Sequence, residues 1–250
     1  MSAPVALYTL GQTPRPDLVP SMVAALNAPE VRVFGLLDGV EPVDIRKPLT
    51  GNYPLKTRLS GGEEIQTDCE FLQPKLQNLI SENEDEYVLH IVLSVAPFRA
   101  LYSDGGLLRP FEHGCRALAS RHIHEICVMV PYREQVFHSR QKWEFAGFSP
   151  NVVCVEDRPQ EQPVEEWMAA CIGDQTTHGI VIDFVGYSKA LTQRLEDALG
   201  LPVMDLGFEA ITFAKSVLEE FGELEKEAGS KRNAWARLTS KFKGSGQDSN

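Results

Sequence analysis

The sequence predicts an α/β protein with mainly parallel sheets, because short apolar runs alternate with segments of helical pattern along most of its 250 residues. The runs at 5–10, 87–95 and 126–130 contain no acidic residue, lysine or arginine, which is typical of strands buried on both faces. The alternation occurs in two series, before and after about residue 122. We therefore expect two similar α/β lobes that face a cleft.

The first series begins with a strand at 5–10, a loop with glycine and prolines at 11–17, and a helix at 18–26. Further elements are expected as a strand at 31–37, an edge strand at 63–68, a helix at 71–80, a central strand at 87–95 and a helix near 115–119. The stretch 40–62 has little periodicity and several prolines, and connections of this length are often functional.

The second series repeats the pattern more regularly. Strands are predicted at 126–130, 151–155, 179–185 and 201–205, and helices at 136–146, 164–172, 189–199 and 208–228. Gly147, Gly173 and Gly200 each follow a predicted helix, the position where glycine commonly ends one.

The two series give the domain organisation that we expect. The first lobe covers 1–121, the second covers 122–205, and the closing helix at about 206–228 packs back on the first lobe. The basic extension at 229–250 is expected to be at least partly disordered and solvated, with a partner or oligomer contact as the alternative.

Composition restricts the partners and the compartment. The formal net charge of −11 disfavours nucleic acid and anionic membranes as partners. No apolar run approaches the roughly 18 residues of a membrane helix, and the N-terminus lacks the basic region of a signal peptide. The five cysteines are odd in number and lack CxxC spacing, which predicts reduced thiols in a cytoplasmic protein.

The loop at 11–17 is the first candidate for a binding site. In open α/β sheets, small ligands bind where the carboxyl end of a strand faces a helix N-terminus, and the helix dipole favours an anion there. Arg15 adds a fork of donors suited to a carboxylate or phosphate, and Arg58 lies in a second cationic loop at 56–62. The alternative is an ordinary turn with a solvated arginine.

Metal and nucleophile motifs are weak in this sequence. His122 and His124 are two residues apart, which is not the spacing of a zinc-binding helix. His138 is followed at helical spacing by Gln141 and Lys142 rather than by a histidine or carboxylate, so we expect it at the surface. The sequence has no GxSxG, P-loop or GxGxxG motif, and we expect neither a metal nor a cofactor.

Six stretches give the chain a resemblance to the AroM family, within the aspartate/glutamate racemase-like superfamily. They fall in register at 11–15, 36–39, 57–62, 93–98, 130–135 and 183–188. The resemblance implies two flavodoxin-like three-layer lobes related by pseudo-twofold symmetry, with a ligand cleft between them. It also implies a small carboxylate ligand, no cofactor, and a possible homodimer.

The racemase-like relatives use two cysteines, one from each lobe, to remove and return a proton beside a carboxylate. Following the family pattern, these cysteines would fall at Ser94 and Phe184. A serine is a poor base without a neighbouring His or Lys, and a phenylalanine carries no proton. We therefore do not expect two-thiol racemisation in this protein.

The resemblance places the remaining loops around the same cleft. The residues expected to bind the ligand are Gln12, Thr13, Arg15, Arg58, Val95, Phe98, Tyr132, Gln135, Gly186 and Ser188. Candidate acid, base or nucleophilic residues are Ser94, Glu134, Asp183 and Tyr187. Three of these have structural alternatives: a helix cap for Glu134, a backbone bond for Asp183 and aromatic packing for Tyr187.

Three functions remain open on this basis. The first is a cofactor-independent isomerase or lyase that acts on a small carboxylate with acid and base groups other than cysteine. The second is a non-catalytic binding or regulatory protein that has kept the cleft. The third is a hydrolase or hydratase that uses Glu134 or Asp183.

Overall fold

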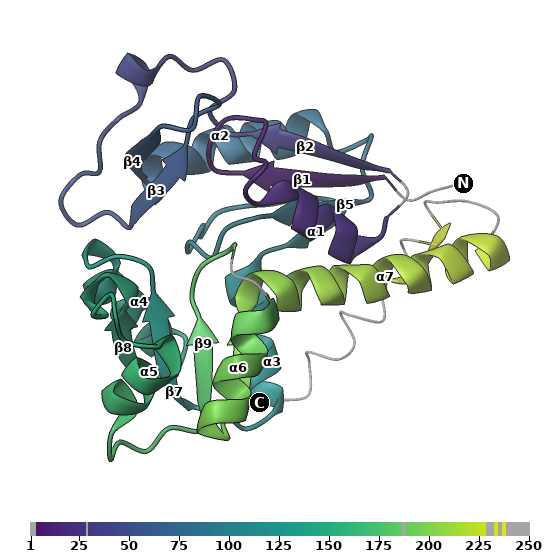
Figure 1. Ribbon diagram of the computed structural model, residues 1–250. Helices are drawn as coiled ribbons and strands as arrows, with labels where there is room; N and C mark the ends of the chain where they lie inside the picture. Colours follow the sequence, from purple (N-terminus) through teal and green to yellow (C-terminus); the bar gives the residue numbers. More distant parts are fainter. Residues whose placement is uncertain (1–3, 29, 187–188, 229–232, 235–236, 239–250) are drawn as a thin grey trace.

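The computed structural model describes residues 4–28, 30–186, 189–228, 233–234 and 237–238, and it has two α/β lobes (Figure 1). The first contains a parallel sheet of β1 (Val5–Thr9), β2 (Val31–Gly35), β5 (Leu89–Val92) and β6 (Gly106–Leu108). The second contains a parallel sheet of β7 (Glu125–Val130), β8 (Ser149–Cys154), β9 (Gly179–Ile182) and β10 (Val203–Asp205). The predicted α/β fold class is confirmed.

The two sheets share one strand order. The first runs β2-β1-β5-β6 and the second runs β8-β7-β9-β10, so each places its strands in the order second, first, third, fourth. This is the order at the start of a flavodoxin-like sheet, in which ligands bind beyond the carboxyl ends of the strands. The sequence prediction of two similar lobes therefore holds at the level of topology.

Helices cover both faces of the first sheet. Along β1, Ala6 and Tyr8 belong to the core shared with α2 (Cys69–Glu82), while Val5 and Leu7 face α1 (Val19–Leu26) and α7 (Leu206–Ala228). The alternation follows from the period of two residues in a strand. Because both faces are buried, every residue of β1 is buried.

The second sheet is covered in the same way. Its strand β7 packs on one face against α3 (Pro110–Ser120) and α4 (Glu134–Phe145), and on the other against α5 (Val164–Ile172) and α6 (Lys189–Leu199). Phe111 and Leu118 of α3 lie in the core of this second sheet. Helix α3 therefore packs with the second lobe, whereas the boundary expected from the sequence assigns residues up to 121 to the first.

A separate antiparallel hairpin stands beside the two main sheets. Its strands are β3 (Pro54–Arg58) and β4 (Glu64–Asp68), paired with Lys56 opposite Gln66. The sequence prediction of an edge strand near 63–68 matches β4, but the loop expected at 56–62 is in part the strand β3. Leu55 and Thr57 are buried and Arg58 is exposed, so β3 has the alternation of a strand packed on one face.

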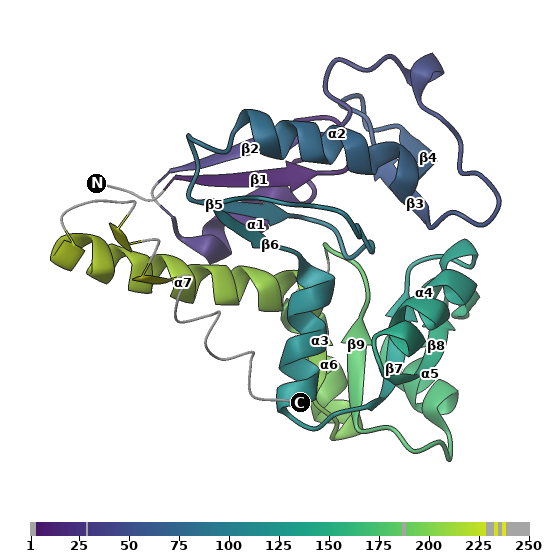
Figure 2. The ribbon, with the colours of Figure 1, turned by 180° about the vertical axis from the view of Figure 1, so that it is seen from behind.

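Helix α7 contacts both lobes (Figure 2). Leu206 packs in the core of the second sheet, while Ala210, Ile211 and Ala214 pack against the first sheet and α1. Ala234 and Leu238 are buried against the distal part of α7, and the neighbouring Asn233 and Arg237 are exposed. Residues 229–232, 235–236 and 239–250 of the predicted basic extension lie outside the described residues. Short 3₁₀ turns at Pro42–Asp44 and Val155–Asp157 complete the described elements. None of the described helices combines the length and apolar character needed to span a bilayer.

Candidate active site between the lobes

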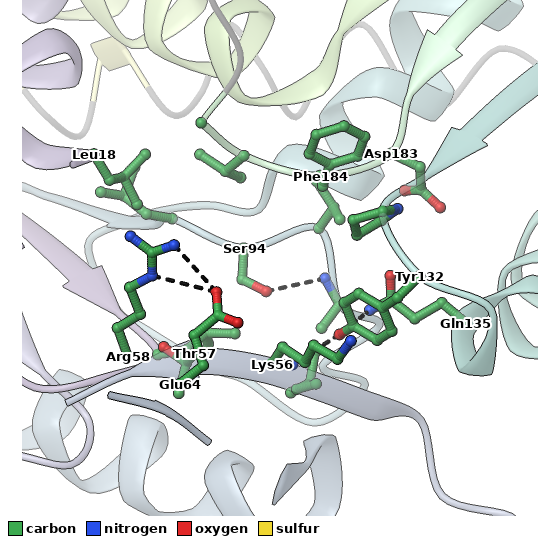
Figure 3. Close-up of a pocket in the computed structure, with 18 of the residues that line it drawn as sticks. Leu18, Lys56, Thr57, Arg58, Glu64, Ser94, Tyr132, Gln135, Asp183 and Phe184 are labelled. Atoms are coloured by element: carbon green, nitrogen blue, oxygen red, sulfur yellow. Dashed lines mark hydrogen bonds and ion pairs between the residues drawn. The ribbon is translucent and has the colours of Figure 1, made fainter. Parts of the chain in front are cut away.

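The candidate site is a cavity of about 360 Å³ that we call the interlobe cavity (Figure 3). It lies beyond the carboxyl ends of β1, β5, β7 and β9, where the topology predicts a ligand. The β3–β4 hairpin forms a further wall. The polar lining of the cavity comprises Arg15, Asp17, Tyr53, Lys56, Thr57, Arg58, Glu64, Ser94, Tyr132, Gln135 and Asp183.

Arg15 is held at the cavity by its own loop. Its Nε and Nη2 atoms donate to the two oxygens of Asp17 at 2.9 and 2.8 Å, and Nη1 lies 3.4 Å from the hydroxyl of Thr57. The hydrogen bond from Arg15 lowers the pKa of Asp17. The Arg15 side chain is 13% exposed, so its charge is largely removed from bulk water.

Two further cations come from β3. Arg58 donates to Glu64 at 3.1 Å and lies 3.7 Å from Asp17, as Figure 3 shows for the Glu64 contact. Lys56 pairs with Glu156 of the second lobe at 3.1 Å. Every cation of the described lining therefore already faces a carboxylate, and an anionic ligand must share or displace one of these partners.

Ser94 supplies a hydroxyl where β5 ends. Its Oγ accepts a hydrogen bond from the backbone N–H of Ala96 at 3.1 Å, so the hydroxyl hydrogen remains available as a donor. None of its described contacts is a histidine or lysine side chain. Ser94 is therefore equipped to donate to a ligand rather than to act as a base.

Tyr132 and Gln135 form the wall from the second lobe. The Tyr132 hydroxyl accepts from the backbone N–H of Lys56 at 2.7 Å and from Gln135 Nε2 at 2.8 Å. Gln135 Nε2 also donates to the carbonyl of Pro54 at 3.0 Å. Burial raises the pKa of Tyr132, so this hydroxyl is a hydrogen-bonding group that ties the hairpin to the second lobe.

Asp183 lies at the end of β9 and is fully buried. One carboxylate oxygen accepts from Lys142 at 2.6 Å, and the other accepts from Ser139 at 2.6 Å and Trp143 Nε1 at 3.1 Å. The sequence predicts Asp183 as an acid or base, but here both oxygens are occupied by α4. Lys142 was missed because a lysine in a polar helix is ordinarily solvated.

Four predicted residues lie outside the cavity lining. Gln12 donates to the carbonyl of Val40, and its Oε1 accepts from Ser60; Thr13 bonds both oxygens of Asp38. Both residues therefore brace loops behind Arg15. Phe98 and Glu134 are also absent from the described cavity lining. Phe98 is buried in the core of the first lobe, and Glu134 is exposed as the first residue of α4.

The remaining predicted residues lie where β5 ends and in the loop after β9. Val95 and Gly186 line the cavity, and Gly186 has φ of +118°, a conformation that glycine adopts without steric cost. Tyr187 and Ser188 lie outside the described residues. Ser94 and Phe184, the positions matched to the two family cysteines, line the cavity, and none of the five cysteines does.

Within the part of the chain that the structure describes, no three histidine, cysteine or acidic residues are grouped to hold a metal ion.

A second cavity of about 720 Å³, which we call the α4 cavity, lies on the other side of Tyr53 and Lys142. Tyr53 lines both cavities, while Lys142 and His138 line the α4 cavity. The sequence predicts His138 at the surface, but in the structure it is partly buried, and this burial lowers its pKa.

This fold of two α/β lobes is shared with solved structures of racemase-like proteins. A glutamate racemase from Francisella tularensis has a TM-score of 0.53 and 11% identity, covering 88% of this chain and 82% of its own. Over residues 5–214 the sequence matches the AroM protein family, and the chain belongs to it. The predicted resemblance is confirmed.

Two other solved structures share the fold. An arylmalonate decarboxylase variant with a bound sulfate ion has a TM-score of 0.56 and 12% identity, covering 86% of this chain and 93% of its own. The maleate isomerase of Pseudomonas putida has a TM-score of 0.53 and 8% identity, covering 86% of this chain and 93% of its own. Among curated protein sequences, none matches this chain.

Proposed function

We propose that this protein binds a small carboxylate in the interlobe cavity and performs isomerase or lyase chemistry on it without a cofactor. The observation that carries the proposal is the position of Arg15, a largely enclosed guanidinium that faces the same cavity as the Ser94 hydroxyl. A guanidinium and a hydroxyl are together the donors that a carboxylate requires.

The distribution of titratable groups favours proton transfer from one side. The first lobe and its hairpin contribute the carboxyl groups of Asp17 and Glu64 to the cavity. Both oxygens of Asp17 accept from Arg15, whereas Glu64 pairs with Arg58 through Oε1. The described lining of the second lobe contributes Tyr132 and Asp183, whose oxygens are already hydrogen-bonded. Inversion by two opposed bases needs a free group on each face. With Asp17 and Asp183 both engaged, Glu64 is the remaining carboxyl candidate of the described lining, so a reaction with one proton-transferring face fits better.

The names of the structural neighbours support the ligand class. The glutamate racemase structure contains D-glutamate, and arylmalonate and maleate are both dicarboxylates. A similar ligand in this chain would lie between the cationic β3 wall and the loop that contains Ser94.

A non-catalytic binding protein is the second candidate. It is favoured by the absence of cysteine from the described cavity lining and by the ion pairs of Asp17 and Asp183, which leave few groups free for proton transfer. The hydrolase or hydratase alternative has less support, because Glu134 lies outside the lining and both oxygens of Asp183 are engaged.

Binding is tested by calorimetric titration of malonate, maleate, succinate and glutamate into the wild type and Arg15→Ala. Loss of a charge-assisted contact is expected to weaken binding by about 10- to 100-fold while the protein remains folded. Arg140→Ala, at an exposed position of α4, is the matched control and keeps wild-type affinity. Equal affinity of Arg15→Ala and the wild type would remove Arg15 from the site.

Catalysis is tested by proton NMR of each bound acid in deuterated buffer. Deuterium incorporation beside the carboxylate, or appearance of a product, supports the enzyme, and Arg15→Ala is expected to abolish it. A ligand that binds but stays chemically unchanged and unexchanged supports the binding protein instead.

A further inference from the structure

Lys142 is a buried cation that no candidate chemistry uses. Its side chain is 2% exposed, although it belongs to a helix of mainly polar residues. The ammonium donates to Asp183 at 2.6 Å, to the carbonyl of Val95 at 3.1 Å and to the hydroxyl of Tyr53 at 3.5 Å. A lysine has three N–H donors, and here each has an acceptor.

These three acceptors belong to different walls of the interlobe cavity. Val95 follows Ser94 in the first lobe, Asp183 precedes Phe184 in the second, and Tyr53 precedes the hairpin strand β3. Lys142 itself lies behind this lining, on the side of the α4 cavity. One ammonium group therefore contacts all three segments between which a ligand would be held.

We propose that Lys142 is a positioning residue that sets the separation of the Ser94–Ala96 and Asp183–Gly186 walls, and this inference rests on the proposed carboxylate site. The contact that matters is the one to the Val95 carbonyl. If that carbonyl moves, the Ser94 hydroxyl and the Ala96 N–H that bonds to it move as well.

Anchoring Asp183 alone does not require this lysine. Ser139 and Trp143, one turn apart on the same helix, already donate to the second carboxylate oxygen. A buried ion pair is weak support for stability, because apolar or neutral groups of similar volume often stabilise as well. What Lys142 adds is the connection across the lobes.

The test distinguishes an effect on the positions of the cavity walls from an effect on the stability of the folded protein. Lys142→Met with Asp183→Asn removes both charges together, and the asparagine retains an acceptor for Ser139 and Trp143. We expect this double variant to fold, with a cooperative thermal transition, but to bind the best carboxylate ligand at least tenfold more weakly. Wild-type affinity in the folded double variant would overturn the proposal.

Ser139→Ala is the matched control. It removes a hydrogen bond to the same carboxylate from the same helix, but it leaves the contact between Lys142 and Val95 intact. Its melting temperature is expected to fall while its affinity stays within twofold of wild type. A control that loses affinity as strongly as the double variant would show a merely structural role and contradict the proposal.

A second readout needs no ligand. Backbone ¹⁵N–¹H spectra are expected to show shifted Val95, Ala96 and Gly186 amides in the double variant, and unshifted Val95 and Ala96 amides in Ser139→Ala. If the wild type binds no carboxylate, the proposed function fails while these shifts still decide whether Lys142 sets the walls. Should the double variant not fold, Lys142→Gln takes its place, because its shorter neutral side chain cannot reproduce all three contacts of the ammonium. Unmoved amides with unchanged affinity in that variant would overturn the proposal.

Discussion

Asp205, the last residue of β10, has a carboxyl group that makes no described ion pair. Its pKa is clearly shifted in the folded protein. Its Oδ1 accepts from the backbone N–H of Phe208 at 3.0 Å, at the start of α7, and its buried Oδ2 has no hydrogen-bond partner. Burial raises the pKa of Asp205 to about 6. The folded protein therefore binds this proton more tightly than the unfolded chain does.

This shift predicts a pH dependence of stability. Between the unfolded pKa of 3.8 and the folded value of about 6, the unfolded chain has lost the proton that the folded chain keeps. The free energy of unfolding therefore falls as pH rises through this window, by roughly 3 kcal/mol in all. Asp205→Asn keeps the helix cap and removes the titration, so it is expected to lack this fall.

Urea unfolding of both proteins at pH near 4 and near 7 measures the difference. The carboxyl groups of Asp17 and Asp68, whose pKa values are lowered by hydrogen bonds, change stability in the opposite direction in both proteins and cancel in the comparison. A gap between wild type and variant that stays constant with pH would contradict the assignment.

At the scale of elements, the β3–β4 hairpin is tied to both lobes. The backbone N–H of Gln12 donates to the Arg58 carbonyl at 3.0 Å on the first-lobe side. On the second-lobe side, Tyr132 and Gln135 bond the backbone of β3, and Lys56 lies 4.3 Å above the centre of the Tyr132 ring. The hairpin therefore encloses the cavity by contacts to two bodies at once.

Tyr132→Phe is expected to loosen one side of this closure. It leaves the Lys56 N–H without its acceptor and costs about 1–3 kcal/mol of stability. Hydrogen exchange of the Lys56 amide is expected to accelerate. Tyr102→Phe, which removes the hydroxyl of an exposed tyrosine, serves as the control with unchanged exchange in the hairpin. Equal Lys56 exchange in all three proteins would show that Tyr132 does not hold the hairpin.

The hairpin also illustrates how far sequence analysis reaches. The central strands were predictable because both faces of β1, β5, β7 and β9 are buried, which gives continuous apolar runs. Strand β3 was not, because Lys56 and Arg58 occupy its outward positions and Pro54 begins it. Its strand character comes from pairing with β4, a contact that local composition does not encode.

The residues of the candidate site also differ in whether the sequence predicts them. The loop with Arg15 and the strand end with Ser94 were predictable, because parallel strands bring their carboxyl ends to one edge. The burial of Lys142 was not, because it depends on three acceptors from segments far apart in the sequence. Asp183 stood out as a polar residue at a strand end, but only its partners show that its oxygens are occupied.

For the molecule as a whole, α7 couples the unfolding of the two lobes, because it packs in the cores of both. Leu206 packs against the second sheet, and a Cβ at Gly114 of α3 would lie 2.2 Å from its side chain, so this contact is close. Further along, Ala210 and Ala214 are buried against the first sheet. Unfolding the first lobe therefore removes the support of a helix that the second lobe also needs.

Ala214→Asp is expected to destabilise both lobes together. A charge at this fully buried position of the first-lobe core has no partner there, and the cost is about 3 kcal/mol or more. Trp143 and Trp167 are buried in the second lobe, so in a Trp235→Phe background the fluorescence reports on that lobe. We expect the fluorescence midpoint in urea to fall as far as the circular-dichroism midpoint.

Thr212→Asp, at an exposed position of the same helix, is the control and is expected to leave both midpoints near those of wild type. Coincident shifts in Ala214→Asp mean that the walls of the interlobe cavity are held in one cooperative unit, as a site shared between two lobes requires. A fluorescence midpoint that stays at the wild-type value while circular dichroism reports earlier unfolding would mean that the lobes unfold independently. Opening the cavity would then require the free energy of unfolding of one lobe, not of both.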